Sequence, residues 1–454
     1  MSRSVFIGID IATSNVRAVA IDITGAALAR ASEPLAQVIK GADKSATQDS
    51  KSWITAVDKV LTRLCKQLIE EGFIPKSLLI SATSGTFVLC NQKGEVIAPA
   101  AMYNDGRAGD PLARAAVVIK SLKQSGPFVF ANTPEFVIAH LSDQPLAQIP
   151  TDTSHALKMG VDLDRCDYLA TTKELASSLN ITLPKLVLPG TKIATISNQI
   201  AAKLGIPTIP IYAGMTDGCT AQIAAGGATG SVTSLGTTMV IKVVADSNIS
   251  GDGFYSHLLP SNRYLLGGAS NIGGVSYQKF SPDIESFNNK AAEIPSANFI
   301  TYPLTVTGER FPIKSSSITN LVSAPPESDV MEYRGILEGL AFTERYAYDL
   351  LQKAGAKLSQ TIYTTGGGGK SKVLSQIRAN ILNREVAITN TTGSDMGAAF
   401  LSLASHTKTG DDLTGELMKI NISHGEIFNP ADNEKDDLER NWQEFLTLTA
   451  TYRS

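Results

Sequence analysis

The chain has 454 residues, 43% of them hydrophobic and 18% charged, with a formal net charge of −3. This length exceeds what one hydrophobic core usually serves, so we expect two domains, and the composition excludes a disordered or fibrous chain. The small net charge, without a strongly basic block, argues against nucleic acid or an anionic membrane surface as a partner.

The spacing of the cysteines and the hydropathy of the chain indicate the cellular compartment of the protein. The four cysteines are widely spaced and form no Cys-x-x-Cys pair: Cys65, Cys90, Cys166 and Cys219. This spacing predicts free, buried thiols rather than disulfides or a zinc site. No stretch reaches the roughly 18 apolar residues of a membrane span, and the first residues lack the pattern of a signal peptide. We expect a cytoplasmic protein, or one of an organelle stroma if a transit peptide has been removed.

The first half of the chain is predicted to open with a β-hairpin. Strands at 5–11 and 16–23 are rich in β-branched residues and flank a four-residue turn. Asp10 stands at the end of the first strand. Further strands are expected at 26–31, 77–81, 86–91 and 208–212, and helices at 52–71, 108–123 and 191–204.

The second half repeats the opening pattern. After a run of small residues at 220–230, the segment 230–246 again reads as strand, turn and strand. This echo suggests two related domains that meet near residue 228, although any two antiparallel hairpins look alike. Beyond it we expect strands at 263–266 and 361–365, helices at 275–280, 331–354, 373–382 and 397–404, and a glycine-rich loop at 267–274. Strands that alternate with helices predict α/β layers.

A strand that runs into four glycines and a helix is the strongest single motif, TGGGGKSKVLSQI at 365–377. Glycine lets the backbone approach a ligand closely, and a helix N-terminus favours negative charge. The spacing is not that of a Walker A motif. We favour a nucleotide site over a plain flexible turn.

The hairpin turns at 12–15 and 236–238 carry hydroxyls and successive backbone N–H groups, which can hold phosphate oxygens. Read singly, each could equally be an ordinary turn. Asp10 and Asp217 follow strands, where ligands of open α/β sheets bind. One such carboxylate could position Mg²⁺ through water, and another could accept a proton from a hydroxyl. The alternative for each is a helix cap or turn former.

The segment Tyr103 to Arg107 packs polar groups after an apolar strand and could bind sugar hydroxyls. A type I′ turn at Asp105-Gly106 is the competing interpretation. The five histidines have no metal-like neighbour and receive no catalytic role. Neither a Gly-x-Ser-x-Gly elbow nor a Gly-x-Gly-x-x-Gly fingerprint follows the first strand, so hydrolase and dinucleotide functions have little support.

Nine segments in order resemble the FGGY carbohydrate kinases, a branch of the actin-like ATPase superfamily. They are the hairpin turn at 10–17, YNDGR at 103–107, TDTSHALKMGVDLD at 151–164, AGMTDG at 213–218, SLGTT at 234–238, GGASNIGG at 267–274, GERFP at 308–312, LEGLA at 337–341 and TGGGGKS at 365–371. The resemblance implies an α/β fold of two actin-like ATPase (ribonuclease H-like) domains with a ligand cleft between them. Residues 1–228 would form the sugar-binding domain and residues 229–454 the nucleotide-binding domain.

The resemblance also implies residue roles in transfer of phosphate from Mg-ATP to a sugar or polyol hydroxyl. Asp217 matches the catalytic base, and Asp10 the carboxylate that meets phosphate and, through water, metal. The positions that match nucleotide contacts are Thr13, Ser14, Arg17, Gly236, Thr237, Gly274, Gln278, Gly367, Gly368 and Ser371. The positions that match sugar contacts are Asp10, Ser84, Asn104, Asp105, Arg107 and Asp217.

Several positions depart from the family pattern. Ala12 stands where the first turn usually has Gly, and it would be strained by about 1 kcal/mol if that backbone needs positive φ. Leu374 replaces an aromatic residue beside adenine, which predicts weaker stacking. The other departures are Tyr103 for Trp, His155 for Asn and Asn380 for Asp. These changes bear on ATP affinity more than on the type of reaction.

The substrate prediction rests on Ala-Thr-Ser-Gly-Thr at 82–86, with YNDGR and Asp217-Gly218. This combination is most similar to the compact D-ribulose kinases of cyanobacteria and plants, and it lacks the Arg-Glu pair of glycerol kinases and the Met-His pair of xylulose kinases. D-Ribulose is therefore expected to become D-ribulose 5-phosphate. The alternatives are a kinase of D-xylulose or of another polyol, or a non-catalytic actin-like sugar-binding or ATPase protein. The expected partners are a small sugar and ATP, and the chain is expected to be a monomer or homodimer.

Overall fold

The computed structural model describes residues 3–122, 126–408, 412–431 and 435–453. The chain forms two compact units. Unit 1 comprises residues 1–227, 257–262 and 393–421, and unit 2 comprises 228–256, 263–392 and 422–454. The functional division predicted at residues 228 and 229 stays a prediction, and it does not foresee that residues 393–421 pack with unit 1.

A six-stranded sheet forms the centre of unit 1, in the order β15-β16-β6-β1-β2-β3. Its strands are β1 (Ser4–Ile11), β2 (Asn15–Ile21), β3 (Ala27–Pro34), β6 (Ile74–Ala82), β15 (Lys192–Thr195) and β16 (Pro210–Tyr212). β1 pairs antiparallel with β2 and parallel with β6. A central strand of this kind is covered on both faces, which explains why its sequence is an almost continuous apolar run.

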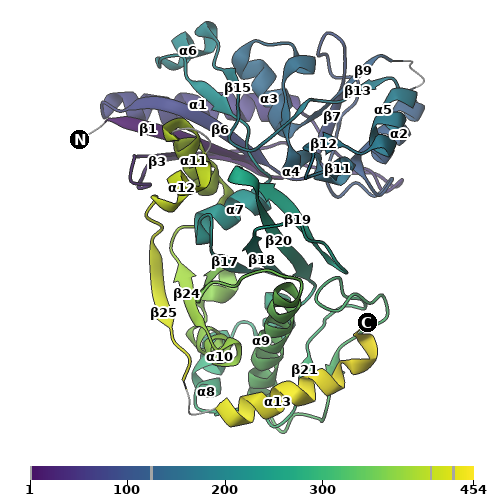
Figure 1. Ribbon diagram of the computed structural model, residues 1–454, viewed down its shortest axis with the longest axis vertical. Coiled ribbons are helices and arrows are strands. Elements are labelled where there is room, and N and C mark those ends of the chain that lie inside the picture. The colour runs from purple at the N-terminus through teal and green to yellow at the C-terminus, as the bar shows by residue number, and fades with distance from the viewer. Residues whose placement is uncertain (1–2, 123–125, 409–411, 432–434, 454) are drawn as a thin grey trace. The chain divides into compact units, whose positions relative to one another are not determined.

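The two faces of β1 contact different helices, because successive side chains of a strand point to opposite sides. Val5, Ile7 and Ile9 join one hydrophobic cluster with apolar residues of α1 (Lys51–Glu70). On the other face, the Phe6 ring packs against His406 of α11 (Ser394–Thr407), with ring centroids 5.7 Å apart and ring planes tilted by 56°. Figure 1 shows α11 against β1 and β6.

Two glycines let α11 approach its neighbours closely. A Cβ added to Gly8 of β1 would lie 2.2 Å from the backbone nitrogen of Ala399. A Cβ on Gly397 would lie 1.7 Å from the carbonyl oxygen of Thr220, in α7 (Asp217–Gly226). The absence of side chains at residues 8 and 397 therefore lets α11 contact both the central strand and the helix that begins with Asp217.

The rest of unit 1 surrounds a second six-stranded sheet, in the order β13-β9-β7-β8-β5-β4. These strands are β4 (Ile39–Lys40), β5 (Ala46–Gln48), β7 (Phe87–Asn91), β8 (Ala100–Ala101), β9 (Phe128–Asn132) and β13 (Ile181–Thr182). The short pairs are β10 (Thr151–Asp152) with β14 (Leu186–Val187) and β11 (Val161–Asp162) with β12 (Asp167–Tyr168). The helices are α2 (Pro111–Leu122), α3 (Thr133–Ser142), α4 (Thr153–Ala156), α5 (Ala170–Ser178), α6 (Asn198–Leu204) and α12 (Leu413–Met418).

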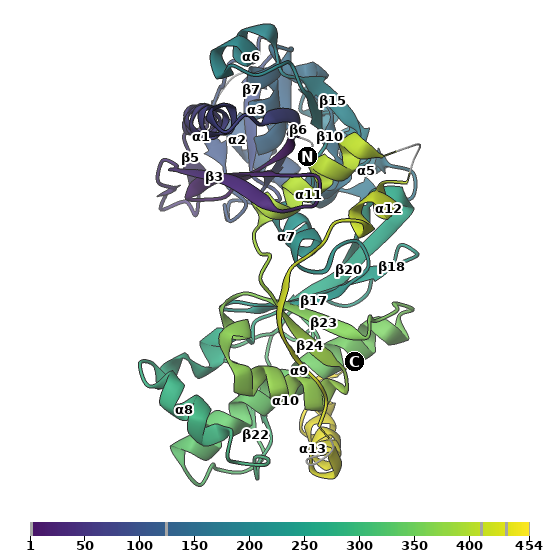
Figure 2. The same cartoon turned by 90° about the vertical axis from the view of Figure 1, so that its left-hand side faces the viewer.

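Unit 2 is built on a sheet of order β19-β20-β18-β17-β23-β24-β25. Its strands are β17 (Ser231–Leu235), β18 (Met239–Ala245), β19 (Phe254–Leu259), β20 (Arg263–Ser270), β23 (Thr361–Thr365), β24 (Glu385–Thr389) and β25 (His424–Phe428). Its helices are α8 (Ile284–Ala291), α9 (Asp329–Lys353), α10 (Lys372–Leu382) and α13 (Lys435–Leu448), and β21 (Thr301–Tyr302) pairs with β22 (Leu321–Val322). Figure 2 shows β17, β23 and β24 as neighbours, with α9 and α10 beside them.

The echo between the two halves extends beyond the hairpins. β1 pairs antiparallel with β2 and parallel with β6, and β17 pairs antiparallel with β18 and parallel with β23. The next neighbours also correspond, because β3 and β20 each add an antiparallel strand, whereas β16 and β24 each add a parallel one. This shared order goes beyond what two unrelated hairpins would produce.

Two sequence predictions are wrong in part. The helix expected at 191–204 begins only at Asn198, because residues 192–195 form β15 against β16 and Ser197 caps the helix by accepting from the Ile200 N–H. The glycine-rich loop expected at 267–274 begins with strand, since β20 continues to Ser270. Gly267 is needed there because a Cβ would lie 2.0 Å from the Ile241 carbonyl oxygen.

The other predicted strands and helices are confirmed with ends shifted by a few residues, although 275–280 forms a 3₁₀ helix, Gly274–Phe280. None of the four cysteines, which all lie within the described ranges, forms a disulfide; three are buried, and Cys166 is half-buried. Within the described ranges, no helix combines the length and apolar character needed to cross a bilayer.

Candidate functional site

Asp10 is a buried carboxylate at the end of β1. It lies opposite Arg17 in the β1–β2 register, and Arg17 Nη2 is 2.7 Å from Asp10 Oδ2. Asp10 Oδ1 is buried and accepts no hydrogen bond within the described residues. Burial raises the pKa of the Asp10 carboxyl, whereas the hydrogen bond and charge of Arg17 lower it. The charges of Asp217 and Asp395 raise the Asp10 pKa further, to about 6 from an ordinary 3.8.

Asp217 and Asp395 approach this carboxylate from two other elements of unit 1. Asp217 is the first residue of α7 and is half-buried, and its carbonyl oxygen accepts from the Ser394 hydroxyl at 3.1 Å. Asp395 lies in the first turn of α11 and pairs with Arg30 at 2.9 Å. The structure thus brings the predicted Asp10 and Asp217 into electrostatic contact and adds Asp395, which sequence reasoning missed.

The first hairpin turn leaves its hydroxyls available. Thr13 is half-buried and Ser14 is exposed, and neither hydroxyl makes a hydrogen bond within the part of the chain that the structure describes. The turn closes through Ala12 N–H, which donates to the Asn15 carbonyl at 3.0 Å. The strain considered for Ala12 does not arise, because Ala12 does not have positive φ.

Besides Asp10 and Asp217, the predicted sugar-contact residues are Ser84, Asn104, Asp105 and Arg107. Ser84 is half-buried and Asn104 is exposed. Asp105 is fully buried, and its carboxylate accepts from Arg107 at 2.6 Å and from the Ala46 N–H at 3.1 Å. Asp105 therefore holds Arg107 in place. The type I′ turn considered for Asp105-Gly106 is absent, since neither residue has positive φ.

Arg114 and Lys158 support the same loops and were missed. Arg114 is buried in α2 and donates to the carbonyl oxygens of Gly85, Tyr103 and Asp105, at 2.7, 3.1 and 3.3 Å. One guanidinium thus joins both predicted sugar loops. Its position on the apolar face of a predicted helix was a usable signal. Lys158 Nζ donates to the Ser84 carbonyl at 3.2 Å.

In unit 2, the turn after β17 contacts the loop after β20. Gly274 N–H donates to the Gly236 carbonyl at 2.8 Å, and Val275 N–H donates to the Thr237 carbonyl at 3.2 Å. Gly236 and Thr237 are exposed, as is Gln278 in the following 3₁₀ helix. The predicted Gly236, Thr237 and Gly274 therefore lie together.

The glycine motif packs beside the same turn. Gly366 has φ of +90°, and a Cβ on Gly368 would lie 2.8 Å from Leu235 Cβ, so packing and backbone shape require both glycines. Gly367 differs, because its φ is not positive and a Cβ there would meet nothing within 4 Å. A closely approaching ligand would account for glycine at this exposed position.

Ser371 acts within the protein as well. Its hydroxyl accepts from the Leu374 N–H as the N-cap of α10 and donates to Asn288 Oδ1 at 2.9 Å. Tyr333 donates to the same Asn288 oxygen, also at 2.9 Å. Leu374 is buried in the core, so it does not present a surface for adenine.

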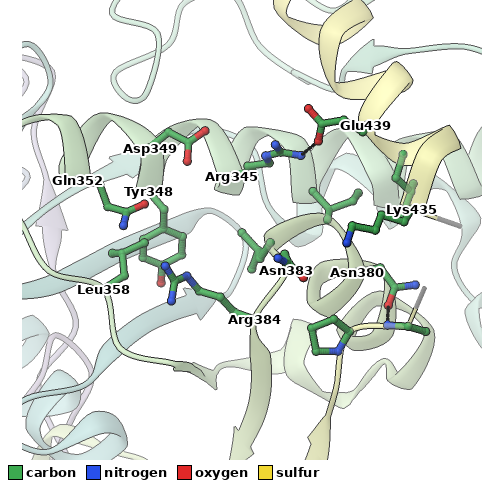
Figure 3. Close-up of a pocket in the computed structure, with 15 residues that line it drawn as sticks. Arg345, Tyr348, Asp349, Gln352, Leu358, Asn380, Asn383, Arg384, Lys435 and Glu439 are labelled. Carbon is green, nitrogen blue, oxygen red and sulfur yellow. Dashed lines mark hydrogen bonds and ion pairs between the residues drawn. The ribbon is translucent and has the colours of Figure 1, made fainter. Parts of the chain in front are cut away.

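A polar cavity of unit 2 lies away from these motifs. A cavity of about 240 Å³ is lined by α9, the end of α10 and α13, with Arg345 and Glu439 paired at 2.9 Å (Figure 3). None of the predicted site residues lines it.

The residues fit a metal held through water. Within the described residues, no group of three or more His, Cys, Asp or Glu could hold a metal ion directly. The unpaired, buried Oδ1 of Asp10 can nevertheless accept a hydrogen bond from a metal-bound water.

Comparison with known proteins identifies the family. The sequence model described as the FGGY family of carbohydrate kinases, N-terminal domain, matches residues 5–115, and the model of the C-terminal domain matches residues 216–405. The chain belongs to the FGGY family of carbohydrate kinases. It is thus a carbohydrate kinase, and sugar kinases of this family use ATP.

Individual relatives align with this chain over nearly its full length. Xylulose kinase from Staphylococcus epidermidis is 23% identical over 96% of this chain and 95% of its own. The structure of a ligand-bound xylulose kinase from Lactobacillus acidophilus aligns with a TM-score of 0.80 and 20% identity, over 99% of this chain and 98% of that one. A Plasmodium falciparum glycerol kinase with ADP gives 0.82 and 16%, over 98% of both chains. The predicted two-domain actin-like ATPase fold is confirmed.

The raised pKa of Asp10 predicts the pH dependence of the kinase. We expect kcat/KM to rise with pH through a midpoint near 6, because the ionised Asp10 carboxylate is the form that accepts from a metal-bound water and attracts the metal charge. Asp395→Asn removes a charge that raises this pKa and should move the midpoint to lower pH. Arg17→Gln removes the group that lowers the pKa and should move the midpoint to higher pH.

Steady-state rates between about pH 5 and pH 8 measure these midpoints. Asp167→Asn serves as a control, since Asp167 is exposed and pairs with Lys173. Shifts of the Asp395 and Arg17 variants in the same direction would contradict the electrostatic assignment.

Gly367 gives a second prediction. Gly367→Ala should leave the melting temperature unchanged, because its Cβ meets open space, and should raise the KM for ATP about tenfold, which corresponds to about 1.4 kcal/mol. Gly109→Ala is the matched control, since a Cβ at residue 109 also meets nothing within 4 Å. An unchanged KM for ATP in Gly367→Ala would show that no nucleotide approaches this backbone.

Proposed function

We propose that this carbohydrate kinase phosphorylates the terminal hydroxyl of a pentulose, with D-xylulose as the first substrate. The observation that carries the proposal is the near-complete coverage of relatives that are xylulose kinases. D-Xylulose, the alternative in the sequence analysis, therefore replaces D-ribulose as the first candidate.

D-Ribulose remains the second candidate because of residues 82–86. The segment reads Ala-Thr-Ser-Gly-Thr and lacks a Met-His pair near Ser84. In the structure, Thr83 and Thr86 bond each other through their hydroxyls at 2.8 Å, and Thr86 accepts from the Tyr103 N–H at 3.0 Å. These hydrogen bonds join the two loops that we expect to contact the sugar. The sequence at 82–86 therefore bears on which pentulose the loops accept.

The proposed reaction is in-line phosphoryl transfer. The oxygen of the sugar's terminal hydroxyl attacks the γ-phosphorus of ATP, and its proton passes to the carboxylate of Asp217. The bond between the γ-phosphorus and the β–γ bridging oxygen breaks, and its electron pair leaves with ADP. Such transfer needs mainly alignment and neutralisation of charge, which positioned side chains and backbone N–H groups supply.

Other residues of the site would bind and orient the reactants. Thr13 and Ser14 offer free hydroxyls to phosphate oxygens, and the Gly236–Thr237 turn offers exposed backbone. Mg²⁺ that enters with ATP would neutralise charge on the transferred group, with Asp10 Oδ1 accepting from one of its waters. Ser84 and Asn104 would contact sugar hydroxyls.

The base assignment predicts a separation of activities. Asp217→Ala should lower kcat for sugar phosphorylation by about 10² to 10⁴-fold, the usual contribution of a positioned base, while ATP binding persists. Coupled ADP release measures the rate, and calorimetry measures ATP binding. Asp167→Ala, which removes an exposed carboxylate of the same unit, should match the wild type. Full kinase activity of Asp217→Ala would refute the assignment.

The same ADP-release assay tests the substrate. We expect D-xylulose to give the highest kcat/KM, followed by D-ribulose, in a panel that also contains glycerol, L-fuculose and hexoses. A higher kcat/KM for glycerol or a hexose than for either pentulose would overturn the pentulose proposal. ADP release without any sugar dependence would favour an actin-like ATPase over a sugar kinase, and no ADP release with any sugar would favour a sugar-binding protein without turnover.

A further inference from the structure

A buried polar cluster lies next to the start of α7, and the proposed function gives it no role. It consists of Asp152, Ser154 and His155, at most 3% exposed. We call it the capping cluster. Asp152 caps α4, because its Oδ1 accepts from the N–H groups of Ser154 at 2.8 Å and His155 at 3.1 Å. The Ser154 hydroxyl donates to the same Oδ1 at 2.6 Å.

The capping cluster is bonded directly to the residue before Asp217. The Ser154 Oγ accepts from the Thr216 N–H at 2.9 Å. Thr216 is the N-cap of α7, and Asp217 is its first residue. Ser154 thus uses its donor for Asp152 and an acceptor lone pair for Thr216. Since the hydroxyl hydrogen is committed to a carboxylate, the oxygen is fixed in the orientation that receives the Thr216 N–H.

The backbone on the other side of Asp217 is also held. The Ser394 hydroxyl donates to the Asp217 carbonyl oxygen at 3.1 Å. The peptide N–H before Asp217 and the carbonyl of Asp217 itself are therefore both fixed by serine hydroxyls. These two bonds fix the backbone from which the Asp217 side chain extends. Asp217 itself is half-buried.

His155 is the third residue of the capping cluster, and burial of its polar ring costs free energy. Its Nδ1 bonds Asp152 Oδ2, and its Nε2 is buried without a hydrogen-bond partner in the described residues. Burial lowers the His155 pKa, but the charges of Asp152, Glu135 and Asp217 outweigh it and raise the pKa. A buried ring with one unsatisfied nitrogen is costly, which indicates that the capping cluster has a function beyond packing.

We propose that the capping cluster positions Asp217 for proton transfer, through the bond from Ser154 to Thr216. This inference rests on the proposed role of Asp217 as base. Loss of the Ser154 hydroxyl leaves the Thr216 N–H without its partner and frees the start of α7. A displacement of about 1 Å in a reacting group can lower a rate about 100-fold. The effect should fall on kcat, since no residue of the capping cluster is predicted to contact ATP.

Serine variants test the proposal. Ser154→Ala should lower kcat for sugar phosphorylation about 10- to 100-fold, with the KM for ATP unchanged within about twofold. Ser154→Thr restores the hydroxyl and should recover most of the rate. Ser142→Ala is the control, because Ser142 is a buried serine of the same unit whose hydroxyl bonds only its own helix, at Ile138. Melting temperatures are measured for every variant.

The outcomes separate positioning from simple stability. Equal losses in Ser154→Ala and Ser142→Ala that follow the melting temperature, or an unchanged kcat in Ser154→Ala, would overturn the proposal. If Ser154→Ala does not fold, Ser154→Cys keeps the volume with a weaker acceptor and should show an intermediate kcat; a wild-type kcat in that variant overturns the proposal.

A double variant separates this inference from the proposed function. If Ser154 acts through Asp217, Ser154→Ala should cause no further loss in an Asp217→Ala background. Additive losses would overturn the positioning role while leaving the base assignment intact. If Asp217→Ala is fully active, the base assignment itself fails, whatever Ser154→Ala shows.

Discussion

Asp10 is buried against α11 because residue 8, two positions earlier on the same face of β1, is a glycine. The strand period places Phe6, Gly8 and Asp10 on one face. Any side chain at residue 8 would strike the backbone of α11. The helix therefore lies close to the strand, with its first turn beside Asp10. This contact removes the Asp10 carboxylate from water and brings it near the charges of Asp217 and Asp395, which together raise its pKa.

In unit 2, a buried ion pair holds the sheet and two helices together. Arg378 of α10 and Glu344 of α9 are fully buried and paired at 2.6 Å. Arg378 also donates to the Thr364 hydroxyl at 2.7 Å, and the Thr233 hydroxyl bonds Glu344 at 2.5 Å. β17 and β23 are thus tied to both helices just before the Gly236 turn and the glycine motif. Because every partner is satisfied, removal of either charge would leave the other buried and unpaired.

Much of the fold and part of the site follow from local sequence. β-Branched runs with short polar turns are specified by neighbours, so both hairpins were predicted, as were Asp10 and Asp217 at strand ends. Ser197 and the pairing of β15 with β16 explain the misread helix, since a strand partner is a tertiary feature. Asp395 was missed for a similar reason, because it comes near Asp10 only through the packing of α11. Asp152 and His155 lie three residues apart in a segment that the sequence analysis used only for the family resemblance, because their hydrogen bond depends on the local fold of α4.

The account depends most on the protonation of Asp10, which can be measured directly. Titration of ¹³C-labelled aspartate carboxyl groups by NMR, with Asp10→Asn to assign the signal, gives the Asp10 pKa in solution. The account predicts a carboxyl that titrates near 6 in the wild type, higher in Arg17→Gln and lower in Asp395→Asn. An Asp10 signal that titrates at or below the ordinary 3.8 would show that neither burial against α11 nor the neighbouring carboxylates governs this residue.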